Sequence, residues 1–142
     1  MARAMPQPPS PSFMTASLLV AAGGALGSWL RFCVGRAWVV AIGPMKAGLF
    51  PWGTLTVNVL GSLAMGLLTG WLARLGPHNE ATRLLMAVGV LGGFTTFSSF
   101  SLDVVSMLQR GQSGAGLIYL AVSLAAGLAG LWLGLQLMRA AV

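Results

Sequence analysis

Five hydroxyl side chains lie within seven residues of a long apolar segment: Thr95, Thr96, Ser98, Ser99 and Ser101. They follow Gly92-Gly93, and glycine and β-branched threonine are both poor helix formers. If the segment crosses a membrane, a break here must be stabilised by protein or an aqueous cavity. The carbonyl oxygens freed by the break are hard ligands suited to a desolvated alkali cation. The alternative is a glycine-kinked helix whose hydroxyls bond back to its own carbonyls.

Two aromatic rings and one amide could contact an anion. Phe97 and Phe100 are three residues apart and therefore share a helix face. An aromatic ring has a positive edge, so two rings turned edge-on could line an anion path, although ordinary packing explains the same spacing. Asn58 is the only amide in the middle of an apolar span. Its N–H groups could bind an anion, or the side chain could hold two helices together.

Other polar residues lie inside or near the ends of apolar segments. Arg31 is deep in the first of them, and a charge at that depth suggests function, unless the side chain snorkels to the interface. Tyr119 and Ser123 are one helical turn apart in the last segment and add two hydroxyls. Asp103 lies near the end of the third. These positions complete the set of candidate functional residues.

The composition identifies the environment that must hold these residues. The chain has 142 residues, of which 56% are hydrophobic and only 7% are charged, whereas soluble domains carry about 25% charged residues. Four apolar segments are each long enough for the roughly 20 residues that a membrane helix needs. We expect an all-α integral membrane protein with spans at 15–40, 52–73, 84–108 and 114–138.

The rest of the chain is short and offers no enzyme chemistry. Residues 1–13 contain four prolines and no apolar run, which predicts a disordered tail followed by a single transmembrane domain over 14–142. No nucleophile constellation, metal-ligand cluster or phosphate loop is present, so we do not expect an enzyme. The basic residues are scattered singly, which argues against a nucleic-acid partner.

The basic residues also bear on membrane orientation, which follows the excess of Lys and Arg in cytoplasmic loops. With four spans, Arg3, Arg74, Arg83 and Arg139 fall on one side, and Arg36, Lys46 and Arg110 fall on the other. Four against three is nearly balanced, so we expect the chain to insert in both orientations. Two opposed copies could then pair through the small residues that line the spans.

Three motifs together resemble one known family, the CrcB or Fluc fluoride channels. They are GALGSWLRF at 24–32, GTLTVNVLG at 53–61 and GGFTTFSSFS at 92–101. The resemblance covers nearly the whole chain after the tail. It implies a multi-pass protein of the cell inner (plasma) membrane that passively exports fluoride. It also implies an antiparallel, dual-topology homodimer whose third helix is broken mid-membrane.

The resemblance also implies residue roles. Asn58 is expected to be the pore amide, Phe97 and Phe100 the rings beside the ion, and Arg31 the family's basic residue. The hydroxyls along the path are expected from Ser98, Ser99, Tyr119 and Ser123. A structural sodium ion on the dimer axis would be held by the backbone carbonyls of Gly92 and Thr95. Two residues depart from the family pattern: Asp103 replaces the usual glutamate, and Gly127 stands where some members have a hydroxyl.

Two other functions fit four short apolar spans. A small proton-coupled multidrug transporter would need a membrane-embedded carboxylate to exchange protons for cationic drugs. The first, second and fourth spans contain none, and Asp103 lies toward the end of the third. A purely structural subunit of a larger complex would leave the polar run at 95–101 without a role.

Overall fold

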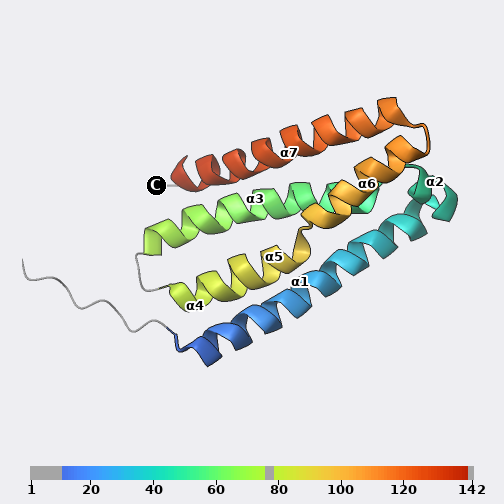
Figure 1. The fold of residues 1–142 in the computed structure, drawn as a ribbon. Helices are drawn as coiled ribbons and strands as arrows, with labels where there is room; N and C mark the ends of the chain where they lie inside the picture. The colour runs from blue at the N-terminus through green and yellow to red at the C-terminus, as the bar shows by residue number, and fades with distance from the viewer. Residues whose placement is uncertain (1–10, 76–78, 141–142) are drawn as a thin grey trace, which may run out of the picture.

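The computed structural model describes residues 11–75 and 79–140, and all the regular structure in these ranges is helical. Four long segments run side by side (Figure 1): α1 (Phe13–Ile42), α3 (Trp52–Leu75), the composite segment Glu80–Gln109, and α7 (Ser113–Ala140). Each is long and apolar enough to cross a membrane. The all-helical fold with four long apolar helices is thus confirmed, and the helix bounds differ from those of the predicted spans by at most four residues.

The two ends of α1 have local causes. Ser12 caps the helix because its side chain accepts a hydrogen bond from the Thr15 N–H at 3.2 Å. The helix ends before Gly43, whose φ of 82° is strained for any residue with a side chain. Of the predicted tail, residues 1–10 lie outside the described ranges, and Phe13 already belongs to α1.

Between α1 and α3 the chain forms a short helix, α2 (Pro44–Leu49), that the sequence analysis did not predict. Pro44 occupies its first turn, where the fixed φ of proline suits a helix and the missing N–H costs nothing. The helix covers one end of the bundle (Figure 1).

The third long segment changes its helical geometry along its length. It consists of α4 (Glu80–Thr82), the π-helical η1 (Arg83–Leu91), α5 (Gly92–Phe94) and α6 (Phe97–Gln109). Gly92 and Gly93 are helical, and the non-helical residues are Thr95 (φ −85°, ψ 160°) and Thr96 (φ −154°, ψ 120°). The Thr96 hydroxyl accepts from the Ser99 N–H at 3.2 Å and so begins α6 with an N-cap.

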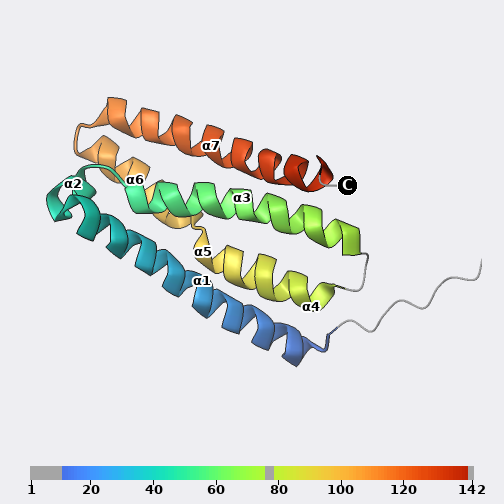
Figure 2. The same ribbon diagram turned by 180° about the vertical axis from the view of Figure 1, so that it is seen from behind.

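Small residues allow the helices to approach closely. A Cβ added to Gly27 of α1 would collide with the carbonyl oxygen of Val90 in η1, and one added to Gly134 of α7 would collide with that of Leu63 in α3. Lipid provides no hydrophobic drive for association, so such backbone contact is a main source of packing energy. In Figure 2 α6 lies behind α3, so it covers only one face of the layer that α1, α3 and α7 form.

Candidate functional site

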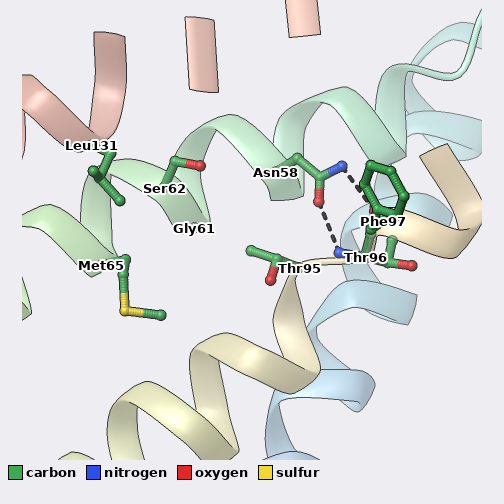
Figure 3. A pocket seen from close by; sticks show the side chains of 8 residues that line it. All are labelled: Asn58, Gly61, Ser62, Met65, Thr95, Thr96, Phe97 and Leu131. Atoms are coloured by element: carbon green, nitrogen blue, oxygen red, sulfur yellow. Dashed lines mark hydrogen bonds between the residues drawn. The ribbon is translucent and has the colours of Figure 1, made fainter. Parts of the chain in front are cut away.

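The extended residues Thr95 and Thr96 are held by Asn58 of α3 (Figure 3). The Asn58 Nδ2 donates to the Thr96 carbonyl oxygen at 3.1 Å, and the Thr96 N–H donates to Asn58 Oδ1 at 2.8 Å. One amide thus satisfies both backbone groups of a residue that has left the helix. Of the two roles left open for Asn58, the structure supports the one in which it ties two segments together. The Nδ2 atom carries a second hydrogen, and Asn58 also lines two surface cavities.

Arg31 of α1 also contacts this extended segment. Its Nη1 donates to the Thr95 carbonyl oxygen at 3.3 Å. Arg31 also lines a cavity of about 300 Å³ together with Thr54, Ser99 and Asp103. The guanidinium therefore lies beside the interruption between α5 and α6, where it places a positive charge next to a polar cavity.

The hydroxyl run divides into two groups. Thr95 Oγ1 donates to the Leu91 carbonyl at 2.9 Å, and Ser101 Oγ donates to the Phe97 carbonyl at 2.9 Å. These two hydroxyls bond back to carbonyls of their own helical segment, which was the alternative to a role in binding. The hydroxyls of Thr96, Ser98 and Ser99 instead form a cluster around Thr96 Oγ1, with distances of 3.3 Å to Ser98 and 3.1 Å to Ser99. Thr96 thus has a central position that the sequence did not single out.

The two phenylalanines occupy different environments. Phe100 is buried and packs against Tyr119, with ring centroids 5.4 Å apart, whereas Phe97 is 78% exposed. Their own centroids are 5.9 Å apart with planes tilted by 45°. A ring as exposed as Phe97 at the start of a membrane-embedded helix must face lipid, a partner or an ion path.

Tyr119 and Ser123 of α7 are both buried. The Tyr119 hydroxyl donates to Asp103 Oδ2 at 3.4 Å, which connects α7 to α6. The Ser123 Oγ lies close to Tyr119 but meets the full geometry of a hydrogen bond with no described residue. Ser123 also lines a cavity with Asn58 and Phe100, so its hydroxyl is available to a ligand there.

Two open cavities bring these residues together. One, of about 270 Å³, is lined by Asn58, Ser62, Thr95, Thr96 and Phe97 (Figure 3). The second, of about 210 Å³, shares Asn58, Ser62 and Phe97 and adds Phe100 and Ser123. Sequence reasoning did not select Ser62, although its spacing of one turn from Asn58 is the signal that places both on one face of α3.

The fold and this site can be set beside known proteins. The family model described as CrcB-like protein, Camphor Resistance (CrcB), matches residues 18–135. The chain belongs to the CrcB family. Members named fluoride-specific ion channel FluC include one from Novosphingobium aromaticivorans, 53% identical over 89% of this chain and 98% of the relative. A relative from Hyphomonas neptunium is 49% identical over 89% of this chain and 97% of the relative. One from Rhizobium etli is 46% identical over 91% of this chain and 100% of the relative.

Proposed function

We propose that this CrcB protein is a fluoride-specific ion channel that passively exports cytoplasmic fluoride. The main observation is the 210 Å³ cavity lined by Asn58, Ser62, Ser123 and the rings of Phe97 and Phe100. A small anion that leaves water needs hydrogen-bond donors to replace its hydration. This cavity offers neutral donors and two aromatic rings, and the positive edge of such a ring can attract fluoride without the fixed cation that would trap it.

Passive export is sufficient for physical reasons. Hydrogen fluoride is a weak acid that crosses lipid when neutral and ionises in a near-neutral cytoplasm, where the anion is trapped. A negative-inside membrane potential favours exit of the anion by about 2.3 kcal/mol per 100 mV. A selective pore in the inner membrane therefore needs no coupling ion.

The carboxylates argue against the proton-coupled transporter. The sequence contains only two acidic residues. Asp103 accepts a hydrogen bond from Tyr119, and Glu80 pairs with Arg83 at 2.7 Å at the start of the third span. We assign Asp103 to a row of polar side chains along the ion path, with Tyr119, Ser98 and Ser99. We assign Arg31 to the attraction of anions into the cavity of about 300 Å³ that it lines.

The functional unit is an antiparallel, dual-topology homodimer. Its support is the exposure of Phe97, together with the near-balanced basic residues. The test removes Cys33 and places a cysteine among residues 76–80, between the second and third long helices. An impermeant reagent should label about half of the molecules from each side of the membrane. Labelling from one side only, in an active preparation, would contradict the dimer.

A structural sodium ion fits the interruption between α5 and α6, which we place at the middle of the membrane. In a continued helix the Thr96 N–H would bond the Gly92 carbonyl, but it donates to Asn58 instead. The Gly92 oxygen thereby loses its usual donor. The Thr95 oxygen accepts from Arg31, so a sodium ion would use the second lone pair of that oxygen. Backbone oxygens of Gly92 and Thr95 from two copies would form a four-oxygen cage.

The cellular test is growth in fluoride of a bacterial strain that lacks its own fluoride export. Expression of the parent chain should restore growth, and expression of Asn58→Asp should not, because the carboxylate replaces a donor with a negative charge. Failure of the parent chain to restore growth, at confirmed membrane expression, would refute the proposed function, and equal growth with both chains would refute the role given to Asn58.

A further inference from the structure

A groove on the opposite side of α3 from the two cavities that Asn58 lines has no role in the proposed pore. It has a volume of about 340 Å³ and lies between α1, α3 and α7, where its lining includes Trp38, Trp52, Thr56, Leu60, Val122 and Ala126. We call it the outer groove. Several of these side chains are open to the surroundings: Leu60 is 50% exposed and Val122 is 44% exposed.

The polar groups in the lining satisfy one another. The Trp38 Nε1 donates to Thr56 Oγ1 at 3.0 Å, and the Trp38 and Trp52 rings stack with centroids 5.4 Å apart and planes 24° apart. The remaining lining residues are aliphatic. The outer groove therefore suits an apolar occupant rather than an ion or a polar solute.

The outer groove faces away from the proposed pore. On an α-helix two residues that differ by two positions lie about 200° apart. Thr56 and Leu60 line the outer groove, whereas Asn58 and Ser62 line the polar cavities. A partner that covers Asn58 and Phe97 would accordingly leave the outer groove open to lipid.

The length of the outer groove matches one leaflet. Its lining on α3 runs from Trp52, the first residue of the helix, to Leu60, which is about 12 Å along the axis at 1.5 Å per residue. Half of a bilayer's hydrocarbon is roughly 15 Å thick. The tryptophan pair lies at the end where α3 begins, and tryptophan prefers the headgroup level of a membrane.

The charge at that end suits an anionic headgroup. The exposed Lys46 lies on α2, between α1 and α3, and Arg110 donates to the Gly48 carbonyl at 3.5 Å, which places a second cation at this end. Of the two acidic residues, Glu80 begins α4 at the far end of the bundle (Figure 1), whereas Asp103 lines a cavity with the tryptophan pair at this end, where Arg31 lines it too. A phosphate beside the exposed Lys46 would therefore be attracted by Lys46 and Arg110, and the one carboxylate at this end shares its cavity with Arg31.

We propose that the outer groove binds an anionic phospholipid, with one acyl chain between Trp38, Leu60 and Ala126 and its phosphate beside Lys46. The site goes beyond ion conduction and does not depend on which ion the pore carries. The bound lipid fills a space between α1 and α7 that the chain leaves open.

Tryptophan quenching by brominated lipid tests the site. Replacing Trp29, Trp71 and Trp132 with Phe leaves Trp38 and Trp52 as the only emitters. The protein is placed in phosphatidylcholine vesicles that contain a small, increasing fraction of brominated-acyl phosphatidylglycerol. Quenching should saturate as the fraction of brominated phosphatidylglycerol rises. The lipid fraction that gives half-maximal quenching should be about fivefold lower than with brominated phosphatidylcholine, and Lys46→Gln should remove most of this difference between the two lipids.

A matched pair of substitutions locates the occupant. Ala126→Phe fills the outer groove and should abolish the saturable quenching, whereas Ala125→Phe, at the adjacent exposed residue of α7, should keep it. Quenching that follows the bulk lipid fraction for both lipids would overturn the site. An absence of quenching would also overturn it, because a second copy of the chain would then cover the groove. The parent curve and the surface variant Lys46→Gln decide the matter even if Ala126→Phe does not fold.

Discussion

Replacing Asn58 should unfold the chain more easily as well as stop ion flow. In Asn58→Leu the side chain keeps its approximate volume, but the Thr96 N–H and carbonyl lose the partners now at 2.8 and 3.1 Å. Each buried backbone group left unsatisfied costs about 1–3 kcal/mol. The two together predict a loss of about 2–6 kcal/mol in the free energy of unfolding.

The assay combines unfolding in mixed detergent micelles, followed by helical circular dichroism, with fluoride efflux from liposomes. Ser62→Ala is the control, because Ser62 lines the same cavity one turn along α3 but is not among the partners of the Thr96 backbone. Its unfolding free energy should change by less than about 1 kcal/mol. If Asn58→Leu loses flux with unfolding unchanged, Asn58 acts on the ion alone and the reasoning from Thr96 is refuted.

Three further predictions follow from the contacts. Phe97→Ile and Phe100→Ile should each lower fluoride efflux at least tenfold while the dimer still assembles, because the ring edges are lost. If either variant releases fluoride as fast as the parent chain, its ring serves only in packing. Thr95→Ser should change sodium-dependent stability little, because the proposed ligand is its backbone oxygen; loss of the sodium effect would refute this. Gly27→Ala should cost about 1–3 kcal/mol, because its Cβ meets the Val90 carbonyl. Gly24→Ala, which has open space, should be neutral or stabilising by up to about 1 kcal/mol, and equal effects at the two positions would contradict the packing.

The four long helices could be predicted because membrane spans follow from length and hydropathy, which are local properties of the chain. The short helix α2 could not, because six residues of mixed polarity have no clear periodicity. The π-helical geometry of Arg83–Leu91 also escaped prediction. It accompanies close packing against Gly23 and Gly27 of α1, which is a tertiary effect.

The site was predictable as a set of residue types but not as a set of contacts. The sequence left Asn58 divided between an anion donor and a helix tie, and only the fold brings its amide onto the Thr96 backbone. Poor helix propensity predicted a weak point over Gly92-Gly93 and Thr95-Thr96, and within it the glycines stay helical while Thr95 and Thr96 leave the helix. The break falls there because the Asn58 side chain reaches the N–H and the carbonyl of Thr96. It makes the hydrogen bonds that these two groups would otherwise make within a helix.

Voltage-driven anion release tests the central claim most directly. Liposomes that contain only this polypeptide are loaded with potassium fluoride or potassium chloride, with equal pH on both sides, and valinomycin is added to set the potential. The account predicts fluoride efflux that begins with valinomycin, grows with the potassium gradient and needs no proton gradient, while chloride stays inside. Efflux that requires a pH gradient, or equal release of chloride, would contradict a passive fluoride-specific channel.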